Sequence, residues 1–221
     1  CAEVFSFHAT KFFNTFEGGA VATNDDELAK TIRLMKNFGF SGADNVVYVG
    51  TNGKMHEVSA AMGLTSLESL DDVIDTNRRN HEQYVRELDG VPGLRVVRYD
   101  PAERNNYQYV IVEVDAEEAG VSRDALVDVL WAENVRARRY FYPGVHRMEP
   151  YRSYFPHAGM LLPQTERLTR RVMSLPSGTA VGAAEIATIG GIIRQAVAHG
   201  SEVSALAAAL GEGRGHPRGA A

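Results

Sequence analysis

Lys11 is the residue of this chain whose type and setting most directly suggest covalent chemistry. It follows a short apolar run at residues 3–7 and precedes the turn Glu17-Gly18-Gly19. This is how a lysine is presented to a flat cofactor that carries a carbonyl group. The amine can form that bond only while it is neutral, which requires surroundings that disfavour the ammonium form. Five flanking aromatic side chains could provide such surroundings: Phe5, Phe7, Phe12, Phe13 and Phe16.

Ser6 adds a second possible attachment point for such a cofactor. It lies five residues before Lys11, at the end of the predicted strand, where its hydroxyl and neighbouring N–H groups could hold a phosphate. Gly18 and Gly19 allow the sharp turn that must follow. The same residues also fit a plain hairpin with an exposed lysine at its tip. Chemistry alone favours that hairpin, because one lysine near one serine is a weak signal.

A series of motifs along the chain shifts this balance. In order and at similar spacing, they closely resemble those of the DegT/StrS-type sugar-nucleotide aminotransferases, which are pyridoxal phosphate (PLP) enzymes of fold type I. The resemblance covers about residues 3–199. The motifs are SFHATK at residues 6–11, FEGGAV at 16–21, NGKMHE at 52–57, AAMGL at 60–64, NRR at 77–79, YFYPGVH at 140–146 and LPS at 175–177.

The resemblance implies an α/β fold and a set of site residues. The chain would contain the end of the large PLP-binding domain followed by a small C-terminal α+β domain. Lys11 would be the catalytic Schiff-base lysine, and Ser6 would bind the PLP phosphate. Asn52 would reach the phosphate of a partner subunit, which implies a homodimer with shared active sites. Four residues are candidates for substrate contacts: His8, Lys54, Tyr142 and His146. The resemblance implies this role for His146, whereas Lys54 could be a solvated surface charge and His8 and Tyr142 could simply pack within their loops.

Several motifs are most similar to those of enzymes that aminate C4 of dTDP-4-keto-6-deoxyglucose on the way to antibiotic sugars. They include NFGF at residues 37–40, NGKM at 52–55 and NYQYVIV at 106–112. In such an enzyme glutamate donates the amino group to a nucleotide-linked sugar. The freed amine of Lys11 would serve as base and then acid in each half of the exchange.

Two other possibilities remain open beside this one. The sugar 3-dehydratases of the same fold have histidine in place of the Schiff-base lysine, and Lys11 argues against them. The chain also begins at Cys1, almost at the lysine, whereas family members have a long α/β segment before it. That segment carries the aspartate that pairs with the pyridine nitrogen, which makes PLP an effective electron sink. We therefore expect the C-terminal portion of an enzyme, either active within a longer protein or a catalytically incomplete remnant.

Composition excludes several other classes of protein. The formal net charge of the 221 residues is -5, so no basic footprint for nucleic acid is present. No apolar run approaches the roughly 20 residues of a membrane span, and the single cysteine excludes an intrachain disulfide. The seven histidines show no metal-ligand spacing. A cytoplasmic enzyme without a bound metal is the expectation.

The elements that must position these residues can be predicted from local patterns. Strands are expected at residues 3–7 and 20–23, followed by a helix from residue 24 to 39. A long helical stretch at 55–88 should break near 69–72, and residues 90–200 should form the small domain. Its predicted strands cover residues 94–99 and 107–114, and its helices cover 122–134 and 181–199. Residues 1–89 would then end the large domain, and residues 201–221, with few large apolar side chains, predict a disordered tail.

Overall fold

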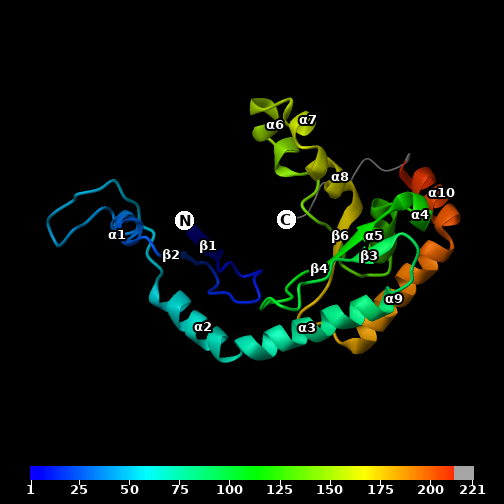
Figure 1. Ribbon diagram of the computed structural model, residues 1–221, viewed down its shortest axis with the longest axis horizontal. Coiled ribbons are helices and arrows are strands. Elements are labelled where there is room, and N and C mark those ends of the chain that lie inside the picture. The colour runs from blue at the N-terminus through cyan, green and yellow to red at the C-terminus, as the bar shows by residue number, and fades with distance from the viewer. Residues whose placement is uncertain (212–221) are drawn as a thin grey trace. The chain divides into compact units, whose positions relative to one another are not determined.

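The computed structural model describes residues 1–211 and divides the chain into two compact units. The first comprises Cys1–Val73, and the second begins at Ile74. Figure 1 shows the elements of both units in chain order.

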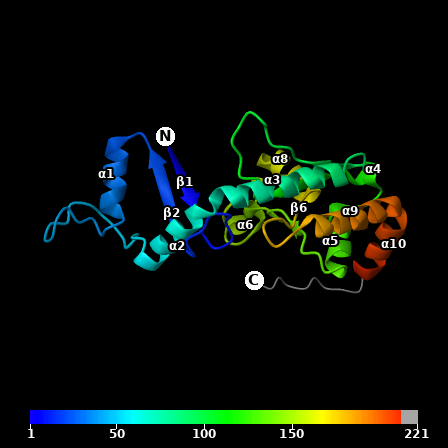
Figure 2. The same ribbon diagram turned by 90° about the horizontal axis from the view of Figure 1, so that it is seen from below.

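The first unit is built on an antiparallel pair of strands that brackets Lys11. Strand β1 (Ala2–Ser6) pairs with β2 (Gly19–Thr23), and Ser6 lies opposite Gly19. Helix α1 (Asp26–Met35) follows, and Figure 2 shows it beside β2. The Asp25 side chain accepts a hydrogen bond from the Leu28 N–H, as expected for an N-cap. The predicted strands and helix are confirmed, with ends shifted by one to four residues.

Two consecutive helices form the predicted long helical stretch. Helix α2 (Glu57–Glu68) begins at His56, whose ring nitrogen accepts from the Ser59 N–H, and helix α3 (Leu70–Glu87) follows after a break at Ser69. The expected unit boundary near residue 89 differs from the observed one at Val73. The reason is that α3 supplies Tyr84 to the core of the second unit, and Leu88 continues that contact.

The second unit contains a four-stranded antiparallel sheet in the order β3-β4-β6-β5. Its strands are β3 (Leu94–Val96), β4 (Val110–Val114), β5 (Arg138–Arg139) and β6 (Val172–Leu175). Helices α5 (Arg123–Ala132) and α9 (Ala183–Ala198) pack together, and α5 also contacts β5 and β6. Their apolar faces and the sheet enclose one core, which includes Val112, Leu126, Met173 and Ile186. The predicted α+β character of this region agrees with the structure.

Several elements of the second unit were not expected from the sequence. The predicted strands at 94–99 and 107–114 are shorter than expected, because residues 97–109 form a connecting loop. Short helices occupy much of the chain before β6. They are α4 (Ala116–Ala119), the 3-10 turn η1 (Val145–Arg147), α6 (Tyr151–Tyr154), α7 (Ala158–Leu161) and α8 (Pro163–Arg171).

The predicted disordered tail is wrong over its first half. Helix α10 (Gly200–Gly211) occupies this segment and packs on α5 and α9. Val203 and Ala207 contact the core, and the Ser204 hydroxyl donates to the Gly120 carbonyl. Alanine is the best helix former and is frequent in this segment. The segment can therefore form a helix with small side chains once it has a surface to pack against. Residues 212–221 of the predicted tail lie outside the described residues. Within residues 1–211, no helix is long and apolar enough to cross a membrane.

Candidate active site

Residues 7–18 between β1 and β2 form a closed loop, which we call the lysine loop. The Phe7 N–H donates to the Gly18 carbonyl at 2.8 Å, and the Thr15 N–H donates to the Phe7 carbonyl at 2.9 Å. The Thr15 side chain is buried, and its hydroxyl donates to the Glu17 carbonyl at 3.0 Å. These bonds hold both ends of the loop together. Lys11 is therefore displayed on a fixed frame.

The lysine loop is anchored to helix α2 of the same unit. The Ser66 hydroxyl donates to the Asn14 carbonyl at 3.2 Å. A Cβ placed on Gly63 would lie 2.8 Å from Thr15 Cγ2, so the glycine allows the loop to approach the helix closely. Phe7 and Phe13 meet edge to face, with ring centroids 4.8 Å apart. The loop conformation therefore depends on α2 as well as on its own hydrogen bonds.

Lys11, Ser6 and His8 lie together at the start of this loop. The Lys11 N–H donates to the His8 carbonyl at 2.9 Å, and the His8 N–H contacts Ser6 Oγ at 3.5 Å. The Lys11 side chain is half-buried, and within residues 1–211 its amine has no hydrogen bond or ion pair. The Ser6 side chain is exposed. Both groups that the sequence assigned to the cofactor are thus available for a ligand.

His8 is oriented by Glu17, a residue that the sequence analysis noted only as part of a turn. The Thr10 N–H donates to His8 Nδ1 at 3.2 Å, so the neutral ring carries its proton on Nε2. His8 Nε2 lies 3.3 Å from a Glu17 carboxylate oxygen. The two residues are adjacent only because β1 and β2 pair. Glu17 is therefore a positioning residue for His8 that the sequence by itself did not reveal.

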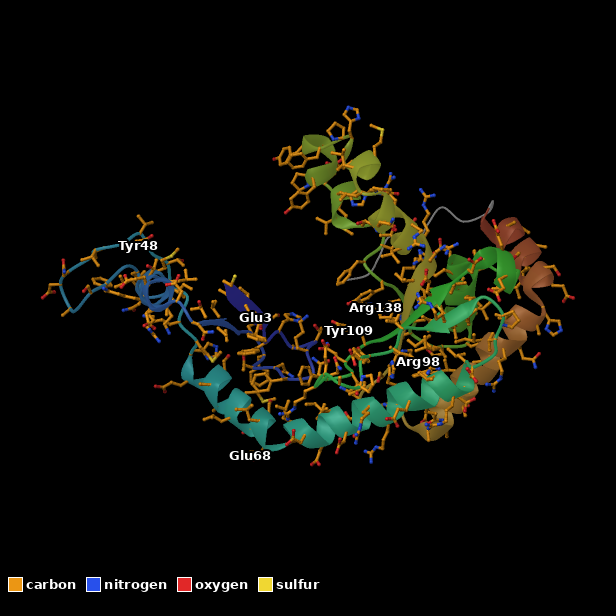
Figure 3. The ribbon with its side chains drawn as sticks, viewed as in Figure 1. Glu3, Tyr48, Glu68, Arg98, Tyr109 and Arg138 are labelled. Atoms are coloured by element: carbon orange, nitrogen blue, oxygen red, sulfur yellow. The ribbon has the colours of Figure 1, made fainter. Side chains whose placement is uncertain are left out.

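Asn52 and Lys54 lie on the segment that connects α1 to α2. Asn52 is exposed and forms an isolated antiparallel bridge with Asn37, while Lys54 Nζ lies 5.0 Å from the centre of the Phe38 ring. A Cβ on Gly18 would lie 2.8 Å from Met55 Cε, so this segment reaches the lysine loop. Figure 3 labels Tyr48 on the preceding loop. Among the described residues, Asn52 has no contact with Ser6 or Lys11.

Tyr142 and His146 lie in the second unit. The guanidinium groups of Arg123 and Arg139 lie 5.3 and 5.7 Å from the centre of the Tyr142 ring. His146 has only 9% of its side chain exposed, and its Nε2 lies 2.6 Å from Glu166 Oε1. Glu166 is twenty residues away on α8, so no local spacing pointed to this pair. The carboxylate fixes the ring of His146 as Glu17 does for His8.

A row of aromatic rings is formed by Tyr109, Tyr140 and Phe141. Tyr140 contacts Phe141 with ring centroids 4.2 Å apart, and it contacts Tyr109 at 5.3 Å. Figure 3 labels Tyr109 and Arg138. Burial raises the pKa of the Tyr140 hydroxyl, which keeps the phenol neutral. The row therefore offers flat aromatic surfaces, and Tyr142 follows Phe141 directly in the chain.

Replacing Gly63 with alanine should loosen the lysine loop. The added methyl group would meet Thr15, which is buried and cannot rotate without losing its hydrogen bond to the Glu17 carbonyl. We expect PLP binding to weaken several-fold, measured by absorbance titration. Gly191→Ala on α9 is the matched control, since a Cβ there meets nothing within 4 Å. Equal PLP affinity in the two variants would show that packing on α2 does not determine the conformation of the lysine loop.

Glu166 should make a pH-dependent contribution to stability. Hydrogen bonds from Arg147 and His146 lower its pKa from 4.5 to about 2. Because the folded pKa lies below the unfolded one, this contribution is complete above about pH 4.5 and is lost as the pH falls toward 2. The melting temperatures of wild type and Glu166→Gln should thus differ most at neutral pH and converge in acid. The exposed Glu68→Gln is the control, and a difference for Glu166→Gln that does not change with pH would contradict the assignment.

The fold and the lysine loop together define a class of protein. A lysine presented after a short strand, followed by a helical segment and a small antiparallel α+β unit, is the arrangement of PLP-dependent fold type I transferases. The chain belongs to the DegT/DnrJ/EryC1/StrS aminotransferase family, whose match covers residues 1–194. Enzymes of this family depend on PLP. The predicted family and fold are therefore confirmed.

Individual relatives support the same assignment. The chain is 40% identical over 149 residues to a dTDP-4-amino-4,6-dideoxy-D-glucose transaminase of Shigella dysenteriae, covering 67% of this chain and 40% of the relative. The Escherichia coli protein of that name is 32% identical over 161 residues, covering 73% and 43%. The chain thus spans less than half the length of these two relatives.

Solved structures show the likeness in three dimensions. A crystal structure of DesI in the presence of its TDP-sugar product has a TM-score of 0.84 and 51% identity, covering 93% of this chain and 52% of that one. DesV of S. venezuelae has a TM-score of 0.79 and 27% identity, covering 89% and 51%.

Proposed function

We propose that the protein is a PLP-dependent transaminase of a nucleotide-linked keto-deoxysugar, with glutamate as the amino donor. The observation that carries this proposal is the half-buried amine of Lys11, which has no partner among residues 1–211 and is displayed on an anchored loop. The preferred substrate is dTDP-4-keto-6-deoxyglucose, aminated at C4. The two transaminases of dTDP-4-amino-4,6-dideoxy-D-glucose and DesI support this choice.

The residues of the lysine loop fit PLP. Lys11 is half-buried and offers an amine without a hydrogen bond or ion pair among residues 1–211, and Ser6 is an exposed residue with a hydroxyl at the end of β1. These are the two groups that the cofactor's aldehyde and phosphate require. When bound, PLP supplies an electron sink that stabilises negative charge on the carbon next to the amino group.

The side chains of the protein then have to move protons and hold the sugar. Lys11 Nζ would take the proton from Cα of glutamate and, in the second half of the exchange, deliver a proton during formation of the amino-sugar. His8, held by Glu17, is placed beside Lys11 on the same loop and would contact the sugar. Lys54, Tyr142 and His146 would contribute further contacts to the sugar nucleotide.

We also propose a homodimer in which Asn52 completes the site of the partner subunit. Asn52 is exposed and makes no contact with Ser6 or Lys11 of its own chain within the described residues. The loop before it exposes a run of large side chains, with Val47 52%, Tyr48 46% and Val49 86% exposed. Exposed apolar side chains in such a run favour burial against another surface.

Reduction of the PLP-loaded protein with borohydride, followed by peptide mapping, tests the cofactor assignment. A single pyridoxyl group on Lys11 is the expected result, because borohydride reduces the bond between a lysine amine and the PLP aldehyde. Lys54 serves as an internal control for nonspecific labelling. Labelling that is spread over several lysines, or absent from Lys11, would refute the site. An assay with dTDP-4-keto-6-deoxyglucose and glutamate then tests the reaction.

A further inference from the structure

A strongly basic cavity of about 770 Å³ lies in the second unit, among η1 and helices α6–α8. Its volume falls within the range of ordinary small-molecule sites, about 300–1,000 Å³. All of its lining residues fall within residues 146–171. The charged groups that line it are Arg147, Arg152, Arg167, Arg170, Arg171 and Glu166.

Two of these arginines are paired with carboxylates outside the lining. Arg152 binds Glu149 through two nitrogens, at 2.8 and 2.5 Å, and Arg171 binds Asp115 at 3.0 Å. Their charges are therefore compensated locally. These two arginines therefore do not account for the positive charge of the cavity.

Of the other three arginines, two share the carboxylate of Glu166. Arg147 Nε lies 2.5 Å from Glu166 Oε1, and Arg170 lies 3.4 Å from Glu166 Oε2 and has 74% of its side chain exposed. In the part of the chain that the structure describes, no hydrogen bond or ion pair is found for the Arg167 guanidinium. Three positive charges against one negative charge leave an excess of two.

We propose that this cavity binds the phosphate or diphosphate group of a small molecule. Guanidinium groups present several N–H donors in a plane that matches phosphate oxygens, and such charge-assisted hydrogen bonds are strong. Arg167 and the exposed edge of Arg170 have donors to spare, whereas Glu166 holds Arg147 in place. Inorganic phosphate, pyrophosphate and a nucleoside diphosphate share this chemistry. The inference rests on the proposed function and deepens it, because His146, which is proposed to contact the sugar nucleotide, also lines this cavity.

Calorimetric titration of the purified protein at low ionic strength tests this inference without any reaction. The probes are inorganic phosphate, pyrophosphate and thymidine diphosphate. The variant Arg167→Gln/Arg170→Gln should raise the Kd of pyrophosphate at least about tenfold, since charge-assisted contacts of this kind are lost. Arg86→Gln, at an exposed arginine of α3, is the matched control and should change the Kd by less than about twofold.

The three probes distinguish the source of the phosphate. Tighter binding of thymidine diphosphate, with competition by pyrophosphate, would assign the cavity to a nucleotide, whereas equal affinities would assign it to the diphosphate alone. Saturable binding by none of the probes, or a Kd that the double variant leaves at its control value, would overturn the inference. Circular dichroism checks folding, and the single variant Arg167→Gln carries the same test if the double variant does not fold.

Discussion

The variant Lys11→Ala is expected to lose transamination by at least about 10³-fold, because the proposed mechanism assigns both the covalent attachment and the proton transfers to this one amine. Lys11→Arg should be as inactive, since a guanidinium stays protonated and cannot perform either task. Noncovalent PLP binding should persist in both variants through Ser6 and the lysine loop. Turnover is measured with glutamate and the keto-sugar, and cofactor binding by absorbance.

Lys54→Ala is the matched control for this prediction. Lys54 belongs to the same unit as Lys11, and its Nζ lies 5.0 Å from the centre of the Phe38 ring. Because Lys54 is proposed to contact the substrate and not PLP, its loss should weaken substrate binding and leave covalent PLP attachment intact. Mixing Lys11→Ala with Asn52→Ala probes the proposed dimer. Shared sites predict recovery of part of the activity, because a mixed dimer contains one site with both residues. Normal turnover by Lys11→Ala would refute the catalytic assignment.

The variant Arg123→Met is expected to cause the largest loss of stability among the substitutions considered. Arg123 is almost fully buried at the start of α5 and donates to two carbonyl groups at the end of α8, those of Thr169 and Val172. Methionine fills a similar space but leaves both carbonyl groups without these donors. The Val172 carbonyl would keep the 3.5 Å hydrogen bond from the Tyr140 N–H, whereas the Thr169 carbonyl would lose its arginine donor. An unsatisfied buried group costs about 1–3 kcal/mol, so the free energy of unfolding should fall by about that amount.

Trp131 provides the measurement, because it is the only tryptophan and lies on α5 of the same unit. Its fluorescence during denaturant unfolding reports the midpoint for the second unit. Arg136→Met, at an exposed position four residues after Ala132, is the control and should shift the midpoint little. If both variants unfold at the same denaturant concentration, the buried arginine does not stabilise the junction of α8 and β6.

Local sequence patterns predicted most of the elements around the candidate site. The apolar run before Lys11, the N-cap at Asp25 and the break at Ser69 each depend on neighbouring residues, so they can be read from the sequence. The same holds for Ser122, whose side chain caps α5 through the Ala125 N–H. The sequence did not predict helix α10, because its side chains are small and the helix is stabilised by packing on α5 and α9.

The sequence by itself determined the type of chemistry. Lys11, Ser6 and His8 lie within six residues, and the ordered motifs from SFHATK to LPS place the chain in its family. Only the tertiary structure decided what holds those groups in place. Glu17 reaches His8 because two strands pair, Gly63 supports Thr15 because a helix packs on the lysine loop, and Glu166 joins His146 to Arg147 from another helix. These contacts join residues that are far apart in the chain. They are determined by side-chain packing, which no local sequence pattern encodes.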